Sequence, residues 1–288
     1  MCVLAGAVGI SMSSMFIKLA GTDPVTSSVL RCGIALVVLA PLAGYELRRR
    51  GRLEARTVWA GLAAGVFLGA DFMMWTSSIF DLGAAIATVL VNVQIIAFPM
   101  LARLLRGTPI PRRFLAACPV MLAGVLLASG ALGGHPGSAH PVRGTVFGVL
   151  AGLAYAVFLY LNRVCGERSP GRSVTAIALA TVGAGAIAAL VGPITTGIEL
   201  PQPPAAWGWL VALALVGQVL SWTLIGVGSP RLAPNATGAL LLLAPVLAVG
   251  FGLVILREEP TAVQLVGCVV VVAAVWVANR RGSRASRG

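Results

Sequence analysis

Apolar residues run in long, nearly unbroken stretches along the chain, and clusters of Pro, Gly, Asp and Arg separate these stretches. A helix needs about 20 consecutive apolar residues to cross the hydrocarbon core of a bilayer. Ten stretches of about this length predict an all-α integral membrane protein with ten transmembrane helices. The predicted ranges are 2–20, 25–46, 57–79, 82–105, 111–133, 143–163, 173–197, 205–227, 232–256 and 260–279.

The composition supports a membrane protein. Of the 288 residues, 58% are hydrophobic and only 10% are charged, and the mean hydropathy is +0.94. A soluble domain carries about 25% charged residues, so this class is excluded. The first apolar stretch has no charged segment before it and no convincing cleavage site, and we expect it to be a retained helix.

Basic residues orient the predicted helices. The 21 Lys and Arg residues exceed the nine Asp and Glu residues and give a formal charge of +12. Seventeen fall in loops on one side or in the C-terminal tail, which predicts that this side and both termini are cytoplasmic. Lys18, Arg143 and Arg257 fall on the other side, and Arg31 falls inside a helix. The seventeen are Arg48, Arg49, Arg50, Arg52, Arg56, Arg103, Arg106, Arg112, Arg113, Arg163, Arg168, Arg172, Arg231, Arg280, Arg281, Arg284 and Arg287.

Nucleic-acid binding is the other explanation of a strongly basic chain. It needs a contiguous groove with interleaved aromatic residues, which short loops between membrane helices do not provide. We therefore expect a lipid bilayer and a small-molecule substrate as partners, and no nucleic acid. Twenty of the 21 basic residues are Arg, and Ala and Gly abound, which favours a bacterial plasma-membrane protein.

The second half of the chain repeats the first. Residues 82–101 align with 232–251 at an offset of 150, and Asp71, Trp75 and Thr76 align with Gln218, Trp222 and Thr223 at an offset of 147. Each copy holds five predicted helices, and an odd number forces the second copy into the membrane in the opposite orientation. We expect two inverted repeats, 1–133 and 143–281, followed by a basic tail, 282–288. Inverted repeats are typical of secondary transporters that work by alternating access.

Arg31 and Asp71 lie within predicted helices, at similar depths below the predicted outer surface. A charge at the centre of a membrane helix costs about 2.5–3.5 kcal/mol, so such residues usually face a cavity or each other. We expect them to pair directly or to line the same part of a cavity. The alternatives are an ion pair that only joins two helices, or an Arg31 that reaches the outer surface. Asp71 is also the candidate for proton coupling, although a partner Arg would favour its ionised form and oppose proton uptake.

Six further polar or aromatic residues extend this candidate site. Trp75 follows Asp71 by four residues, and Trp222 follows Gln218 by the same spacing, so each repeat is expected to present a polar group and an indole on one face. Such pairs suit an amphipathic organic solute, although Trp also serves in packing or as an interface anchor. Asn92, Gln94 and Tyr155 complete the candidate cavity residues.

Asn92 and Gln94 lie two residues apart, so at most one of them is expected to reach the centre of the cavity; bonding between helices is the alternative. The weaker candidates are Ser11, Ser14, Tyr160, Asn235 and Thr237.

Other features favour structural roles. Glycines recur at every fourth residue in two helices, which allows close helix packing, whereas Pro99 and Pro245 are candidate flexible points. The five cysteines have no metal-ligand spacing. His135 and His140 lie in one loop, and no catalytic or nucleotide-binding motif occurs, so we expect no enzyme activity, metal or cofactor. The glycines are Gly61, Gly65, Gly69, Gly144, Gly148 and Gly152.

Two segments resemble the EamA family of the drug/metabolite transporter superfamily. They are GADFMMWTSSIFDLGAAIATVLVNVQ and LAPNATGALLLLAPVLAVGFGLVILREEPTAVQLVGCVVVVAAVWV. Glu258 occupies the position of the family's turn Glu, whereas the aligned residue of the first repeat is Thr108. The resemblance implies an exporter of small solutes or metabolites, with the fifth and tenth helices peripheral to a central cavity. Independently of it, we expect a monomer or homodimer. The alternative is a membrane scaffold that keeps a transporter fold without transport.

Overall fold

The chain is described by a computed structural model that covers residues 1–107, 110, 112–128, 140–195, 197–202, 204–228 and 243–280. Throughout these ranges the regular structure is helical, with no strand. Several predictions fall outside the described residues. They concern Thr108, His135, Arg231, Asn235, Thr237, Arg281, Arg284, Arg287 and the tail 282–288.

The first half of the chain forms four long helical segments and one shorter helix. The fourth segment combines α4 and α5 across a short 3₁₀ turn, η1, and its polar residues Asn92 and Gln94 lie at that turn. The elements are α1 (Cys2–Ala20), α2 (Pro24–Arg50), α3 (Ala55–Leu82), α4 (Ala84–Leu90), η1 (Val91–Val93), α5 (Gln94–Arg106) and α6 (Arg112–Ala128).

The second half contains a helix interrupted by a π-helical segment, η3, which lies between α9 and α10. The corresponding helix of the first half, α3, is α-helical throughout. The elements are α7 (Pro141–Arg168), α8 (Ser173–Val191), η2 (Gly192–Ile194), α9 (Pro204–Ala212), η3 (Leu213–Leu220), α10 (Ser221–Gly228), α12 (Leu243–Val254) and α13 (Ala262–Arg280).

Described helices occur within all ten predicted ranges, but they do not all span a bilayer alone. Seven are long and apolar enough to cross a membrane, and two shorter apolar stretches, Phe114–Leu127 and Ala262–Ala274, accompany them. The ten-helix count and the inverted repeats therefore stay predictions. The seven are Cys2–Ala20, Pro24–Arg50, Ala55–Leu82, Ala84–Arg106, Pro141–Arg168, Ser173–Ile194 and Pro204–Ile225.

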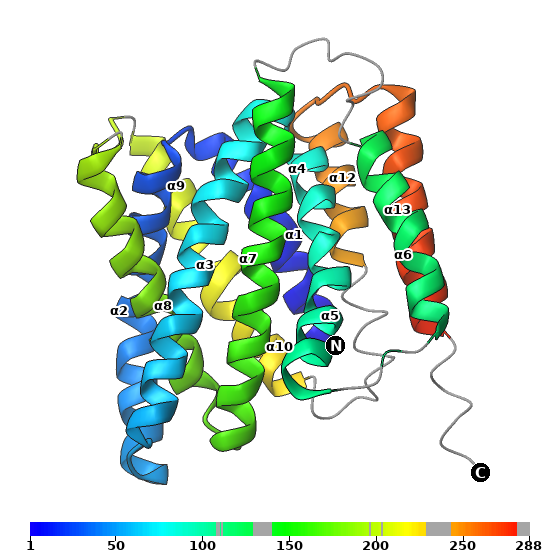
Figure 1. Cartoon of the computed structure of the whole chain (residues 1–288). Coiled ribbons are helices and arrows are strands. Elements are labelled where there is room, and N and C mark those ends of the chain that lie inside the picture. The colour runs from blue at the N-terminus through cyan, green and yellow to red at the C-terminus, as the bar shows by residue number, and fades with distance from the viewer. Residues whose placement is uncertain are drawn as a thin grey trace.

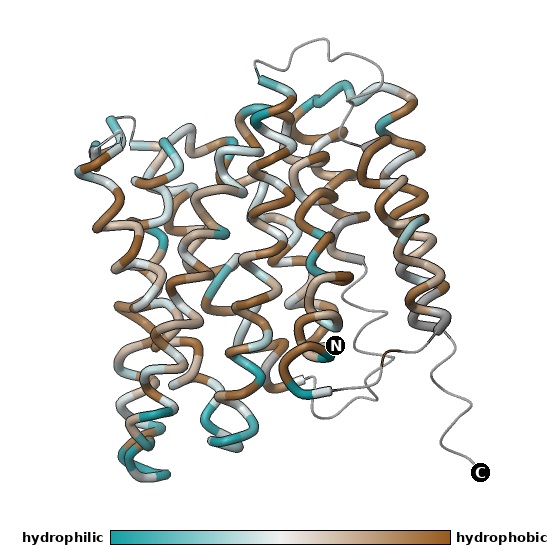
Figure 2. The backbone as a smooth tube through the Cα atoms, viewed as in Figure 1, coloured by the Kyte–Doolittle hydropathy of each residue, from teal (hydrophilic) through white to brown (hydrophobic). Residues whose placement is uncertain are grey.

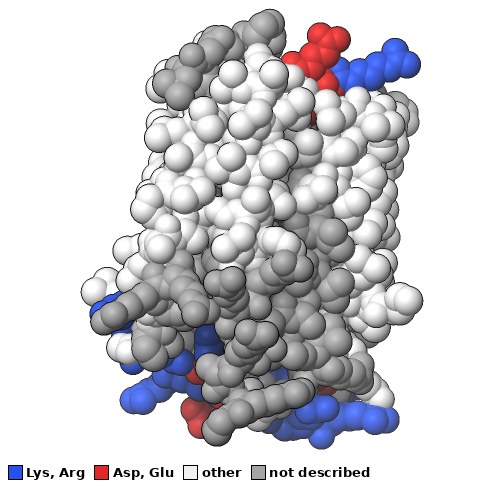
Figure 3. Space-filling model, turned by 90° about the vertical axis from the view of Figure 1, so that its right-hand side faces the viewer, with Lys and Arg blue, Asp and Glu red and all other residues white. Residues whose placement is uncertain are grey.

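The long helices lie side by side and run between two ends of one bundle (Figure 1). α1 begins and α13 ends at the same end, where α2, α5 and α7 also end. Because Arg50, Arg106 and Arg168 terminate those helices, we call it the arginine-rich end. The opposite end contains the turn between α12 and α13, and we call it the Glu258 end. Hydrophilic residues concentrate toward both ends (Figure 2), and Lys and Arg gather mainly at the arginine-rich end (Figure 3).

Both glycine ladders pack inside the bundle. A Cβ on Gly61 would lie 3.0 Å from Leu179 of α8, and Gly69 likewise faces Ala184 of that helix. On α7, a Cβ on Gly152 would lie 2.6 Å from the carbonyl oxygen of Val91 in η1. These contacts confirm packing within the bundle as the role of the ladders, because any larger side chain would separate α3 from α8 and α7 from η1.

α6 and α13 pack together at one edge of the bundle (Figure 1). Met121 and Val125 of α6 share a buried apolar cluster with Cys268 and Val271 of α13. The shared cluster makes the α6–α13 pair a support for α4, whose Ile86 and Leu90 belong to it.

All five cysteines are free, and Cys32, Cys165 and Cys268 are buried in helices.

A tight turn brings Glu258 back onto the bundle. Arg257, just before it, has φ of 52°, and the backbone N–H of Glu258 donates to the carbonyl oxygen of Gly252 at 3.0 Å. The Glu258 carboxylate then accepts hydrogen bonds from the backbone N–H groups of Ala84, at 2.6 Å, and Ala85, at 3.0 Å. The second half of the chain thus caps α4 in the first half.

Candidate functional site

A cavity of about 280 Å³ lies inside the bundle, between the two ends. Its walls come from both halves of the chain: from α1, α2, α3 and the α4–η1–α5 segment on one side, and from α7, η3, α10 and α12 on the other. The lining residues are Ile10, Ser13, Arg31, Asp71, Phe72, Trp75, Thr88, Val91, Asn92, Gln94, Tyr155, Leu159, Gly217, Trp222, Ile225 and Ala244.

The candidate residues from the sequence converge on this cavity. Seven of the eight line it, and the eighth, Gln218, lies behind the lining and contacts Arg31. Whether they bind a substrate stays a prediction. The seven are Arg31, Asp71, Trp75, Asn92, Gln94, Tyr155 and Trp222.

Arg31 is held directly by groups from two other helical segments, α3 and η3, and a residue of α8 supports one of these groups. Its guanidinium carbon lies 3.7 Å from the centre of the Phe72 ring, a cation–π contact. Its Nε donates to Oε1 of Gln218 at 3.0 Å, and Nε2 of Gln218 donates to Oγ1 of Thr181 at 2.9 Å. With 3% of its surface exposed, Arg31 is a fixed buried cation, not a side chain that reaches the surface.

Arg31 and Asp71 line the same cavity but form no direct ion pair within the described structure. Of the two expected arrangements, the shared cavity is therefore the one found. Four buried polar atoms of lining residues have no hydrogen-bond partner among the described residues: Nη1 of Arg31, Oδ1 of Asp71, Nε1 of Trp75 and Oε1 of Gln94. Buried polar groups are rarely left unpaired, so this cluster indicates a place for a polar ligand or water.

Aromatic side chains form one wall of the cavity. The Tyr155 ring stacks on Phe158 with centroids 5.5 Å apart and meets the Trp222 ring edge-on at 6.0 Å. Phe158 also meets Trp222 edge-on at 5.5 Å. Trp222 is thus locked by two neighbours, while Trp75 packs beside an apolar cluster that includes Ile79. The two indoles contribute both packing and cavity surface.

The prediction that Gln218 and Trp222 share a cavity face is wrong, because Trp222 lines the cavity and Gln218 does not. The residues around Gln218 form a π-helix, which has more residues per turn than an α-helix, so two side chains four apart are offset in the opposite direction from that in an α-helix. Asp71 and Trp75 keep the expected relation in α3.

Asn92 and Gln94 both line the cavity, although they lie two residues apart; which of them reaches its centre stays a prediction. They lie in and just after η1, a 3₁₀ turn whose three residues per turn change the direction of side chains two apart. Nδ2 of Asn92 donates to the carbonyl oxygen of Thr88 at 2.9 Å, so its amide is committed locally.

Ser11, Ser14 and Tyr160, the weaker candidates that the structure describes, are not among the lining residues. Oγ of Ser11 donates to the carbonyl oxygens of Ala7 and Ala244, Ser14 bonds within α1, and Tyr160 lies beneath the Arg106 guanidinium, 5.5 Å from its carbon. Sequence reasoning missed Ser13, Thr88 and Thr181. Thr88 precedes Asn92 by four residues and was detectable on that ground, whereas nothing in the sequence connected Thr181 of α8 with Gln218.

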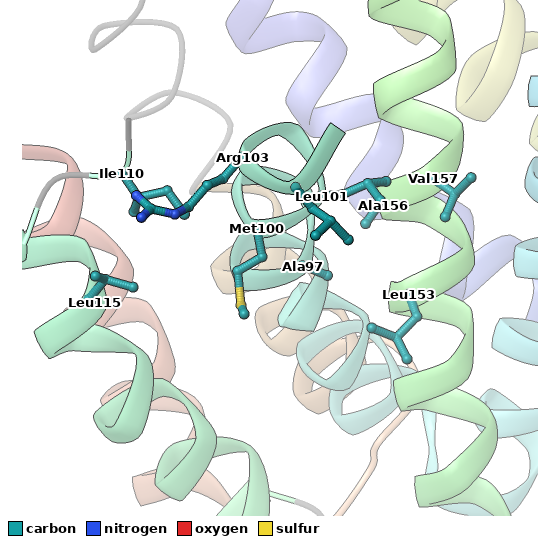
Figure 4. Close-up of a pocket in the computed structure, with 10 residues that line it drawn as sticks. Ala97, Met100, Leu101, Arg103, Ile110, Leu115, Leu153, Ala156 and Val157 are labelled. Carbon is teal, nitrogen blue, oxygen red and sulfur yellow. The ribbon is translucent and has the colours of Figure 1, made fainter. Parts of the chain in front are cut away.

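A second, larger hollow of about 700 Å³ opens between α5, α6 and α7 (Figure 4). Met100, Leu104, Leu115 and Leu153 are among its lining residues, and Arg103 is the one charged residue among those described there. None of the predicted site residues belongs to it. Because it has so few polar groups, it cannot orient a polar solute as the first cavity can.

The side chains that line the inner cavity are suited to bind a small solute. It offers one cation, one carboxylate, an indole donor, an amide acceptor and aromatic surface within one small space. Among the described residues, no group of three or more His, Cys, Asp or Glu side chains has an arrangement that could hold a metal ion. Charged side chains held inside a bundle of apolar helices define the class of multi-pass membrane transporters.

Comparison with known proteins identifies the family. The EamA-like transporter family matches residues 1–130 and 142–280, and the chain therefore belongs to it. An uncharacterized transporter of Archaeoglobus fulgidus is 26% identical over 96% of this chain and 95% of its own length. The uncharacterized protein PA1977 of Pseudomonas aeruginosa is 30% identical over 77% of this chain and 85% of its own. A crystal structure with 17% identity matches with a TM-score of 0.67 over 96% of this chain and 94% of that one, which shows the fold alone.

Proposed function

We propose that the protein is a secondary transporter that exports small organic solutes across the bacterial plasma membrane by alternating access. The inner cavity, with its unpartnered polar atoms and two indoles, is the observation that carries this proposal. The two segments matched by the family, 1–130 and 142–280, support two five-helix repeats with both termini in the cytoplasm. The protein acts as a monomer or homodimer in this proposal.

The solutes are small and amphipathic, with amino acids and drug-like compounds as the leading examples. A volume of about 280 Å³ lies just below the range of about 300–1,000 Å³ typical of drug-sized ligands, so only small solutes fit. Arg31 and Asp71 supply opposite charges for the polar part of the solute, and Trp75 and Trp222 supply surface for the apolar part.

Counterflow in proteoliposomes tests this function. A panel of zwitterionic, anionic and cationic aromatic solutes should include at least one that exchanges faster than in empty liposomes. Trp75→Ala should reduce its rate severalfold, whereas Trp59→Ala, on the same helix but 70% exposed, serves as the matched control. If no solute moves, with or without a proton gradient, the transport proposal fails and a scaffold role takes its place.

Asp71 is the proposed site of proton coupling. Its Oδ1 has no described partner, and Arg31 does not neutralise it by a direct ion pair, so a proton is the simplest counterpart available to it. In the same liposomes, Asp71→Asn should abolish the dependence of transport on the pH gradient, and the exposed Glu259→Gln should retain it. An unchanged pH-gradient dependence in Asp71→Asn would remove Asp71 from this role.

A further inference from the structure

Arg31 is anchored by an uncharged side chain, although a carboxylate lies nearby. Oε1 of Gln218 accepts the hydrogen bond from Nε at 3.0 Å, while Asp71 lines the same cavity without pairing with Arg31. A hydrogen bond to an amide fixes the guanidinium in place but puts no carboxylate in direct contact with its positive charge, on which Asp71 acts only across the cavity. Burying a charge in that condition is unfavourable unless another group supplies the opposite charge.

The orientation of the Gln218 amide is fixed from behind. Its Nε2 donates to Oγ1 of Thr181 at 2.9 Å, and that hydroxyl donates to the carbonyl oxygen of Ile177 at 2.9 Å. Every donor in this chain meets an acceptor. Turning the amide over would place its NH₂ group against the N–H of Arg31, so Thr181 holds the amide oxygen toward the guanidinium.

One face of the Arg31 guanidinium is covered by a ring, and its Nη1 has no hydrogen-bond partner among the described residues. The ring is that of Phe72, whose centre lies 3.7 Å from the guanidinium carbon. Because Arg31 lines the cavity, its unused donor edge and its charge are available to a ligand there. A carboxylate fits this edge best, since two parallel N–H groups of a guanidinium match its two oxygens.

We propose that Gln218 and Thr181 are positioning residues, which hold Arg31 ready to bind a carboxylate or similar anionic group of the solute. This inference deepens the proposed function and rests on it. In the sequence repeat, Gln218 corresponds to Asp71 of the first half, so the second half carries a neutral amide where the first carries a carboxylate. A carboxylate at position 218 would form a permanent ion pair with Arg31 and leave no charge for the solute.

The test compares two probes that differ only in the anionic group, 3-phenylpropanoate and 3-phenylpropanamide. Binding to the purified wild-type protein in nanodiscs should favour the carboxylate by about tenfold or more, the range of a charge-assisted hydrogen bond. Arg31→Met should bring the ratio of the two affinities close to one. Gln218→Leu and Thr181→Val should lower it severalfold while binding of the amide changes little.

Two further variants separate positioning from general damage. Thr181→Ser keeps the hydroxyl and should restore the wild-type ratio. Thr175→Val removes another buried hydroxyl of α8, which bonds Glu46 away from the cavity, and should leave the ratio unchanged. The proposal is overturned if Arg31→Met abolishes the preference while Thr181→Val and Gln218→Leu keep it, or if the wild type does not prefer the carboxylate.

The melting temperature of the protein without ligand tests the role of the Arg31 charge independently. Gln218→Glu places a carboxylate against the unpaired charge of Arg31, so the empty protein should melt about 2 °C or more above the wild type and lose its preference for 3-phenylpropanoate. A lower melting temperature would contradict the inference that the charge is unpaired. Counterflow of other solutes would decide the transport function separately, because that assay does not depend on these two probes.

Discussion

The two ends of the bundle join the two halves of the chain in different ways. At the Glu258 end, buried carboxylates converge on the corner between α3 and α4, Asp81–Ala85. Glu258, whose side chain is 12% exposed, accepts from two backbone N–H groups of α4 and from Nζ of Lys18 at 3.2 Å. On the other side of the corner, Arg143 of α7 makes two hydrogen bonds, at 2.7 and 2.9 Å, to Asp81, which is 3% exposed.

At the arginine-rich end the ties are spread over several helices and lie nearer the surface. Glu167 of α7 accepts from Arg106 of α5 and from Arg163 one turn earlier, but its side chain is 44% exposed. Glu46 of α2 accepts from the backbone N–H and hydroxyl of Thr175 in the first turn of α8, a cap from the other half that resembles the one made by Glu258.

The difference indicates at which end of the bundle separating the helices would cost more free energy. Exposed ion pairs contribute little because water and salt replace them, whereas a buried carboxylate that loses its partners leaves charges and donors unsatisfied. The α3–α4 corner leads directly into cavity-lining Thr88. Under the proposed alternating access, any opening at the Glu258 end that moves the corner away from Glu258 and Arg143 would have to break these contacts.

The largest effect is expected from Glu258→Ala. It leaves the N–H groups of Ala84 and Ala85 and the ammonium of Lys18 without their acceptor, at a cost of about 3 kcal/mol in unfolding free energy. Unfolding monitored by circular dichroism in detergent measures it, with the exposed neighbour Glu259→Ala as the control. Equal stabilities of the two variants would remove the special role of the Glu258 end.

A smaller loss of stability is expected from Arg143→Met. The Asp81 carboxylate stays buried but loses both of its hydrogen bonds from Arg143. The melting temperature should fall, by less than in Glu258→Ala, and adding Asp81→Asn should recover part of the loss because the buried charge is then removed. If the double variant melts lower than Arg143→Met alone, the loss does not come from an unpaired buried carboxylate.

The next prediction concerns Gly252 of α12. A Cβ at this position would lie 2.7 Å from Oε2 of Glu258, so Gly252→Ala should destabilise the protein by about 1–2 kcal/mol. In a Glu258→Ala background only the Cβ of Ala85, at 3.1 Å, stays close, so the loss should become clearly smaller, helped by the better helix propensity of Ala over Gly. A double-mutant cycle measures this coupling, and additive effects would place the Glu258 carboxylate elsewhere.

The sequence predicted the cavity better than it predicted how the cavity is built. Depth and helical spacing brought Arg31, Asp71 and Trp75 together because α2 and α3 are regular α-helices there. The same reasoning failed at Gln218 because a π-helix changes the relative direction of its side chains, and this change has no sequence signature as clear as Gly or Pro.

Long-range partners were equally hidden from the sequence. The sequence singled out Glu258 only because it occupies the position of the turn Glu of the family. Its contacts with Ala84 and Ala85 depend on how α12 and α4 pack. The tie between Thr181 and Gln218 depends in the same way on the approach of α8 to η3. A single chain without its three-dimensional packing does not specify such pairs.

The smallest effect is expected from Glu167→Gln at the arginine-rich end. The Arg143 side chain is as exposed, at 58%, as the arginine partners of Glu167, but the Glu167 carboxylate is 44% exposed against 3% for Asp81, so water already solvates it and its arginines. The melting temperature should not change measurably at 0.15 M salt, and any loss seen at low salt should disappear as salt is added, because screening weakens exposed ion pairs. A loss comparable to that of Arg143→Met, and independent of salt, would make the two ends equivalent and remove the reason to place the costlier opening at the Glu258 end.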